Sequence, residues 1–206
     1  MNYRFLQGDN SKAPLNITIE LLRKILMYHQ VMPSIVDYLS IFGPGFRIKD
    51  HLDENFSSFR EQMLFGRHGS AITDGHIGRS GQQFQITYVL RSMADSSAQG
   101  TVREQQYWNA RPAVIHHQFD AINGNSFWLI AQGGSELEKR IQEMTGSSGR
   151  MEDKSFGNAA ESFRSSLSVH LLCCFWASEG WRWRIQSLNQ LMEEKVSSHA
   201  SLPDAC

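Results

Sequence analysis

The sequence predicts an α/β fold, in which a sheet containing a central β-hairpin packs against helices and a long C-terminal helix follows. The runs Ala113–Phe119 and Asn125–Ala131 are rich in β-branched and aromatic residues and flank Asn123-Gly124. Asn-Gly tolerates the positive φ values of a tight type I′ turn, so the two runs predict a hairpin. Helical patterns before and after these strands then require a layered core.

The length and the net charge of the chain limit the number of domains and the classes of partner. A chain of 206 residues suits one domain, which we expect over residues 1–196, with a disordered tail at 197–206. The net charge is −1 and no basic run of five residues occurs, so nucleic acid is not an expected partner.

Cysteine spacing and hydropathy argue for a cytoplasmic chain. Cys173 and Cys174 are adjacent and Cys206 is the last residue, which suits neither a disulfide framework nor a zinc site. The longest apolar run, Val169–Ala177, is interrupted by His170. It is far shorter than the roughly 20 residues that cross a bilayer.

The N-terminal part of the chain predicts two helices. The first lies near 17–30 and can be capped by Asn16 or Thr18, because its apolar residues then recur at helical spacing. Pro33 can start a second, short helix that reaches Ile41, where Gly and Pro follow.

The middle of the chain alternates between loops and one strand. Phe56 and Phe59 are expected core anchors, and the glycine-rich segment 66–83 is expected to be a loop. Residues 84–91 alternate apolar with more polar side chains, which predicts a half-buried strand. The polar segment 92–105 is expected to be a second loop.

The C-terminal part predicts a short helix and then a long one. Ser135 is placed to cap a helix over 135–144. A helix over Asn158–Val196 would carry one apolar stripe, with a kink or break at Gly180. The stripe comprises Phe163, Leu167, Leu171, Cys174, Ser178, Trp181, Ile185, Leu188 and Met192.

Histidine and cysteine residues suggest a metal site or a thiol nucleophile, but the faces on which their side chains are expected to lie disfavour both. Neighbours in a strand point to opposite faces, so we expect one ring of His116 and His117 inward and one outward, not both on one ion. His170 and Cys174 share a helix face, but that face is apolar, so a packing role is favoured over a nucleophile for Cys173 and Cys174.

Motifs for catalysis or cofactor binding are not found. The glycine-rich stretches at 66–71 and 78–81 lack the pattern of a phosphate-binding loop. Nucleophile-elbow, zinc-protease and EF-hand patterns do not occur. We therefore expect no enzyme, no catalytic residue, no metal ligand and no cofactor.

Trp181-Arg-Trp-Arg mixes aromatic and cationic side chains. At helical spacing Trp181 faces the core, while Trp183 points away from it. Arg182, Trp183 and Arg184 are therefore the candidate interaction surface, with packing of Trp183 in a second layer as the alternative.

Six segments in order carry a family resemblance. They read Val-Met-Pro-Ser-Ile-Val-Asp-Tyr-Leu-Ser-Ile-Phe-Gly (31–43), Phe-Ser-Ser-Phe-Arg (56–60), Ile-Thr-Tyr-Val-Leu-Arg (86–91), Trp-Asn-Ala-Arg-Pro-Ala-Val-Ile-His-His-Gln-Phe-Asp (108–120), Ser-Phe-Trp-Leu-Ile (126–130) and His-Leu-Leu…Trp-Arg-Trp (170–183). This series resembles the soluble N-terminal region of the fungal CorA-like transporter-domain proteins, distant relatives of CorA magnesium channels.

The resemblance implies a cytosolic α/β domain, a long stalk helix, two C-terminal membrane spans and a homopentamer. The Gly-Met-Asn tripeptide of the CorA pore does not occur here. The expected function is thus a soluble, cytosolic-facing assembly or regulatory domain of a CorA-like divalent-cation transporter, lacking the pore itself. The chain would be part of a longer protein, a truncated product or a soluble relative.

The expected partners follow from the same resemblance. They are further copies of the chain and a membrane domain outside it, which would place the chain at the cytosolic face of a membrane. Weak Mg²⁺ binding by carboxylates and water is expected at subunit interfaces. The alternative is an intracellular protein-interaction module without a transport role.

Overall fold

The structure is a computed structural model that describes residues 1–10, 13–43, 59–64, 80–95 and 108–200. Its elements are β1 (Asn2–Leu6), α1 (Ile19–His29), α2 (Ile35–Leu39), β2 (Phe59–Leu64), β3 (Gln83–Asp95), β4 (Trp108–Asp120), β5 (Ser126–Gln132), α4 (Gly134–Thr145), a short 3₁₀ turn (Met151–Asp153), α5 (Ala159–Ser178) and α6 (Trp181–Ala200).

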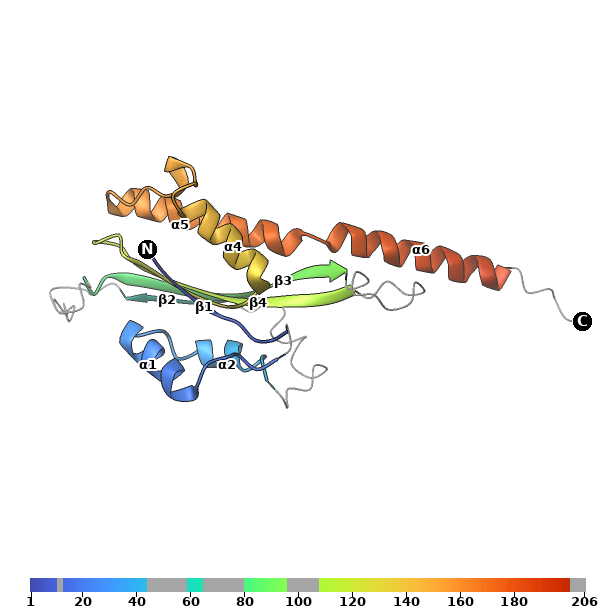
Figure 1. Cartoon of the computed structure of the whole chain (residues 1–206), viewed down its shortest axis with the longest axis horizontal. Helices are drawn as coiled ribbons and strands as arrows, with labels where there is room; N and C mark the ends of the chain where they lie inside the picture. The colour runs from blue at the N-terminus through green and yellow to red at the C-terminus, as the bar shows by residue number, and fades with distance from the viewer. Residues whose placement is uncertain (11–12, 44–58, 65–79, 96–107, 201–206) are drawn as a thin grey trace, which may run out of the picture.

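The predicted α/β class is confirmed. One five-stranded sheet has the order β1-β5-β4-β3-β2, and β1 runs parallel to β5 while the other neighbours are antiparallel. Helices α1 and α2 cover one face of the sheet, and α4 and α5 cover the other (Figure 1). Helix α6 continues beyond the sheet toward the C-terminus.

The predicted hairpin is formed by β4 and β5, but its turn is not type I′. The loop closes when the Asp120 N–H donates to the Asn125 carbonyl at 2.8 Å and the Gly124 N–H donates to the Asp120 carbonyl at 2.9 Å. Gly124 has a φ of +68°, whereas Asn123 does not have a positive φ. The connection is therefore longer than a two-residue turn, and the prediction of its type was wrong.

The Asp120 side chain organises this loop. Its carboxylate accepts hydrogen bonds from the N–H groups of Ile122 at 3.0 Å and Asn123 at 2.9 Å, and from the Ser80 hydroxyl at 2.6 Å. Burial raises the pKa of Asp120, but the hydrogen bonds from Asn123, Ser80 and Ile122 outweigh it and hold the pKa below its usual value. The turn is thus specified by a carboxylate as much as by Asn-Gly.

Strand β3 is half-buried, as predicted, but its more buried face is the more polar one, and the apolar side chains of the other face stay partly exposed. Its more polar side chains, including Gln85 and Thr87, lie under α1 and α2 with almost no exposure. Gln85 is satisfied there, because its Oε1 accepts from the Met32 N–H at 2.7 Å and its Nε2 donates to the Gln30 carbonyl at 2.9 Å. Helices on both sides force such pairing.

Two apolar cores result, one on each face of the sheet. The core beneath α1 and α2 contains Leu6, Val31, Ile35, Tyr38, Leu39, Phe42, Val89, Val114, Phe127, Leu129 and Ala131. The core beneath α4 and α5 contains Ala113, Ile115, Trp128, Ile130, Leu137, Ile141, Val169, Cys173 and Trp176.

The edge strands β1 and β2 were not predicted. Phe59, an expected core anchor, lies on β2 and is 53% exposed, because β2 is exposed along its whole length. Phe56 and most of the segment 66–83 lie outside the described residues.

Helix ends also differ from expectation. Thr18 caps α1, and its Oγ1 accepts from the Leu21 N–H at 3.2 Å. Helix α4 begins after Gly133, so Ser135 is not its cap. Helix α6 reaches Ala200, whereas residues 201–206 lie outside the described part of the chain.

Gly124→Ala should destabilise the protein more than Gly134→Ala. Both glycines have positive φ, at +68° and +75°, and a side chain there is strained by about 1–2 kcal/mol. A Cβ at Gly124 would also lie 2.9 Å from the Ala159 Cα at the start of α5, whereas nothing lies within 4 Å of one at Gly134. Urea denaturation measures both, and equal losses would contradict close packing of the loop on α5.

Candidate interaction surface

The apolar stripe predicted for the long helix faces outward on α5. Leu167 and Leu171 are exposed, the latter by 58%, and Phe163 is also exposed, although its ring contacts Phe119 of the sheet with centroids 5.5 Å apart. The buried residues of α5 are Ser162, Ser165, Ser166, Val169, Cys173 and Trp176. The predicted stripe was therefore out of phase, because the face that packs on the sheet consists of serine and cysteine side chains together with Val169 and Trp176.

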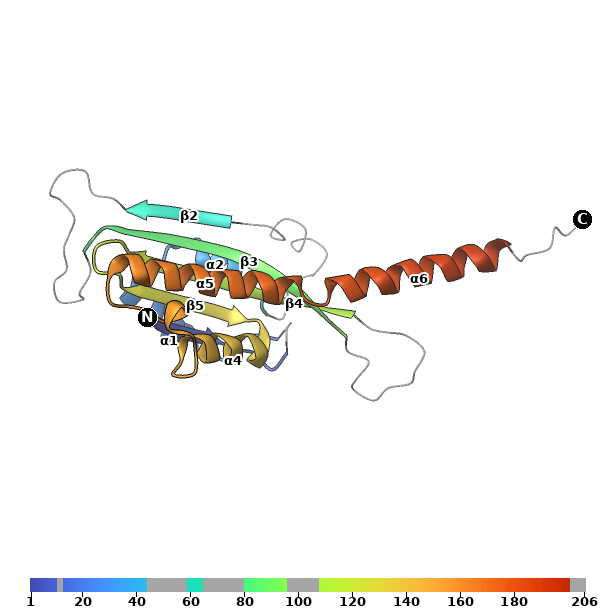
Figure 2. The ribbon, with the colours of Figure 1, turned by 90° about the horizontal axis from the view of Figure 1, so that it is seen from above.

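Helix α6 carries exposed apolar residues along its length and extends past the sheet (Figure 2). Ile185, Leu188, Met192 and Val196 are all exposed, and their spacing of three, four and four residues places them on one helix face. The described part of the chain leaves this face uncovered. We call these four residues the α6 stripe.

The expected break at Gly180 separates α5 from α6 and lies against β3. Gly180 has a φ of +78°, and a Cβ there would collide with the Met93 carbonyl oxygen. The Met93 N–H donates to the Glu179 carbonyl at 3.3 Å, and Trp181 Nε1 donates to the Arg91 carbonyl at 3.0 Å. The end of β3 thus fixes where α6 begins.

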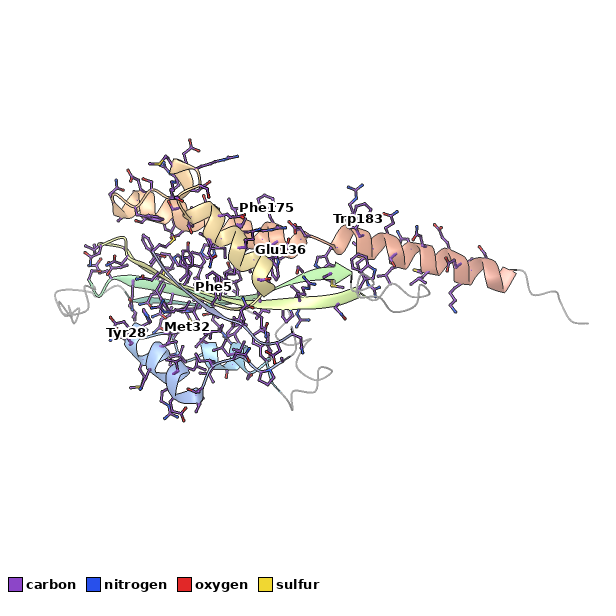
Figure 3. The ribbon with its side chains drawn as sticks, viewed as in Figure 1. Phe5, Tyr28, Met32, Glu136, Phe175 and Trp183 are labelled. Carbon is purple, nitrogen blue, oxygen red and sulfur yellow. The ribbon has the colours of Figure 1, made fainter. Side chains whose placement is uncertain are left out.

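The candidate interaction residues lie in the first turn of α6. Trp183 is 59% exposed and is labelled in Figure 3. The Arg182 guanidinium carbon lies 5.7 Å from the centre of its ring, and Arg182 is exposed, whereas Arg184 is partly buried. Packing of Trp183 in a second layer is not observed, and a role in binding stays a prediction.

The two neighbouring histidines point to opposite faces of the sheet, as predicted, but both rings are fully buried. His116 faces α1, and its Nδ1 lies 2.8 Å from the Thr87 Oγ1. Its Nε2 has no hydrogen-bond partner. Burial, followed by the nearby His29, lowers the pKa of His116 to about 3. Neither ring is outward, because helices cover both faces.

His117 faces α5 and belongs to a set of four linked side chains that the sequence analysis did not find. Its Nε2 lies 2.9 Å from the Ser126 Oγ, and its Nδ1 lies 3.0 Å from the His170 Nε2. The His170 Nδ1 lies 2.6 Å from the Tyr88 hydroxyl oxygen. We call Ser126, His117, His170 and Tyr88 the histidine chain.

The environment of the histidine chain keeps it neutral. The His117 ring stacks on Trp128 with centroids 4.0 Å apart. Burial lowers the pKa of His170 to about 4, and burial together with His170 lowers the pKa of His117 well below its usual value. Burial raises the pKa of Tyr88. Imidazoles, phenol and hydroxyl therefore all stay uncharged at neutral pH.

The cysteines next to this chain do not form an activated thiol. Cys173 is fully buried, as its predicted packing role requires, while Cys174 is exposed on the outer side of α5. Burial, and then Cys174, raises the pKa of the Cys173 thiol to about 12. His170 bonds to Tyr88 and His117, so no ion pair forms with either cysteine.

The structure describes residues 1–10, 13–43, 59–64, 80–95 and 108–200. Those residues contain no group of three or more His, Cys, Asp or Glu side chains arranged to hold a metal ion. No helix among them is both long and apolar enough to cross a membrane.

Acidification should weaken the fold before the carboxylates titrate. His116, His117 and His170 have lowered pKa values in the folded state, so the unfolded chain binds more protons below pH about 6.5. The free energy of unfolding then falls as pH falls, by up to about 1.4 kcal/mol per pH unit for each histidine.

Urea denaturation between pH 7.5 and 4.5 measures this dependence. In the variant His116→Gln the slope of the free energy of unfolding against pH should fall by about one third, because one of the three histidines that take up a proton on unfolding is removed. A free energy of unfolding that stays constant over this range would show that the buried rings are not held neutral.

One of the comparisons with known proteins identifies a family. The family model of the CorA-like transporters matches residues 1–200. No curated protein and no solved structure matches significantly. The match covers β1 through α6, so the sheet, both helix layers and the projecting helix are all included. On this evidence the chain belongs to the CorA-like transporter family.

Proposed function

We propose that this chain is the cytosolic-facing assembly or regulatory domain of a CorA-like divalent-cation transporter, and does not itself form the pore. Membership of the family supports the link to transport. The α6 stripe is the observation that carries the assembly role. A helix that leaves the folded body with an uncovered apolar face needs a partner, because exposed apolar rows of this kind mark interaction sites.

A further copy of this chain is the proposed partner of the α6 stripe. Ile185, Leu188 and Met192 follow each other at intervals of three and four residues, the spacing of a coiled-coil seam. Polar Gln186 and Gln190 lie on the other side of the helix, outside the α6 stripe. Packing helices side by side would place several sheets around one stalk.

The variant Leu188→Glu should shift the chain toward monomer in sedimentation velocity. A carboxylate in the stripe would be desolvated in the contact, which costs several kcal/mol without a partner charge. The control is Gln190→Glu, which adds the same charge on the opposite side and should leave assembly unchanged. Both sites are exposed, so neither variant should unfold the chain. Equal behaviour of the two would remove the stripe as an interface.

Magnesium is the proposed transported ion, and its contact with this domain would need two protomers. The described residues of one chain do not fit a metal site. Mg²⁺ prefers carboxylate oxygens and water, so a weak site between copies is the expected form.

Calorimetry and sedimentation with Mg²⁺ and Zn²⁺ test this expectation. Millimolar Mg²⁺ should raise the oligomer fraction with weak heats, whereas Zn²⁺ should not bind with the affinity of a closed four-ligand site. Tight, stoichiometric Zn²⁺ binding to the monomer would overturn our interpretation of the histidines.

A protein-interaction module without a transport role is the second candidate. The exposed Trp183, with Arg182 over its ring, favours it, because exposed tryptophan and arginine are enriched at binding hot spots. A chain that stays monomeric with and without Mg²⁺ would favour this candidate over the transporter domain.

A further inference from the structure

The histidine chain is the direct polar link between α5 and the centre of the sheet. Ser126 lies on β5, His117 on β4, Tyr88 on β3 and His170 on α5, so three strands and one helix meet in four side chains. The rest of the α5 contact is apolar or made by small residues. The His117–His170 hydrogen bond therefore depends on the protonation of two imidazoles, whereas the apolar and small side chains around it do not titrate in the same pH range.

With both imidazoles neutral, the three hydrogen bonds of the histidine chain can form in only two arrangements. One proton must lie between the His117 Nδ1 and the His170 Nε2, so one nitrogen donates and the other accepts. If His170 donates, its Nδ1 accepts from Tyr88 and the His117 Nε2 donates to Ser126. If His117 donates, all three bonds reverse. In both cases His117 and His170 have the same tautomer.

The short Tyr88 bond selects the first arrangement. At 2.6 Å the contact is typical of an O–H donor and shorter than ordinary N–H donation. The phenol keeps its proton because burial raises its pKa. Tyr88 thus donates to the His170 Nδ1, and both imidazoles carry their proton on Nε2.

Added protons act on this arrangement in two distinct steps. The first goes to the His170 Nδ1, where Tyr88 changes from donor to acceptor and every bond survives. The second must go to the His117 Nδ1, which faces the His170 Nε2–H. Two N–H groups then point at each other with two positive charges in one buried site, and the contact cannot persist.

We propose that the His117–His170 pair is an acid-operated latch, which holds α5 on the sheet until it has taken up two protons and then releases the helix. The latch stays closed with no added proton or with one. Its response is steeper than that of a single histidine, because release needs both protons. This inference concerns α5 alone and does not rest on the proposed function.

The groups packed around the latch do not compensate a positive charge. Tyr3 faces it from β1, Tyr88 from β3 and Cys173 from α5, and burial raises the pKa of each, so they stay neutral. His116 lies on the same strand but faces the other side of the sheet. Helix α4 contributes the apolar Leu137 and Ile141 to this core, and its Glu136 is paired with Arg140.

Hydrogen exchange at residue resolution measures the release between pH 7.5 and 4.5, after correction for intrinsic rates. The opening equilibrium of α5 amides around Val169–Cys173 should rise about 100-fold per pH unit below the histidine range, which corresponds to two protons. Amides of β4 and β5 should stay protected at the pH where α5 opens. Joint loss of protection in α5 and the strands would overturn the latch.

Two substitutions separate the latch from general acid sensitivity. His170→Gln can still donate and accept, but it does not titrate, so the α5 opening should rise only about 10-fold per pH unit. His116→Gln removes a buried histidine from the opposite face, and the α5 slope should stay at two protons. An unchanged slope in His170→Gln would refute the proposal.

Nitrogen-15 spectra of the imidazoles test the same idea in the unmodified protein, whether or not the variants fold. At pH 7.5 His117 and His170 should both carry their proton on Nε2. Opposite tautomers would mean that the bond between the rings is absent, and the latch would fail.

Discussion

Coverage of the β4–β5 hairpin on both faces is the constraint on which the rest of the structure depends. Every residue from Ala113 to Asp120 and from Ser126 to Gln132 is buried. A strand pair placed between two helix layers has no solvent side, so each polar side chain on it must find a partner within the protein. This requirement explains why the hairpin is surrounded by specific side-chain bonds as well as by apolar packing.

The polar side chains of the sheet also fix its register. His117 fits only the α5 face, where His170 and Ser126 meet it, and Gln85 fits only the face on which Met32 offers an N–H. A shift of the strand register by one residue would turn these side chains to the opposite face of the sheet, where they would have no hydrogen-bond partners. Each such loss costs about 1–3 kcal/mol. Three buried side-chain atoms on the hairpin are exceptions among the described residues, because the His116 Nε2, the Gln118 Oε1 and the Trp128 Nε1 have no hydrogen-bond partner.

The elements that sequence reasoning found are those with a local signal. Residues close in the sequence determine three of these features: the hairpin flanks, the α1 cap at Thr18 and the break at Gly180. The prediction of which face of α5 is buried was wrong. It assumed that the apolar face packs on the sheet, whereas in α5 that face is largely exposed and several small residues lie against the sheet. Strand β2 has no buried face to produce a pattern.

The candidate site was harder to predict than the fold, since its parts are distant in the chain. His117 and His170 are 53 residues apart, and only the packing of α5 on the sheet brings them together. The alternation rule placed His117 on one face correctly, but it carried no information about which helix would cover that face. The exposure of Trp183 was easier, because it follows from helical spacing relative to Trp181 alone.

The contact between Gly180 and Met93 gives α6 the mechanics of a lever. A helix of 20 residues is about 30 Å long, and α6 is held at one end, where the last residues of β3 meet the junction. A rotation of about 10° at that end would move the far end by about 5 Å, given the same length. Small rearrangements at the end of a strand are thereby amplified into displacements as large as a helix turn, at the end of the molecule farthest from the sheet.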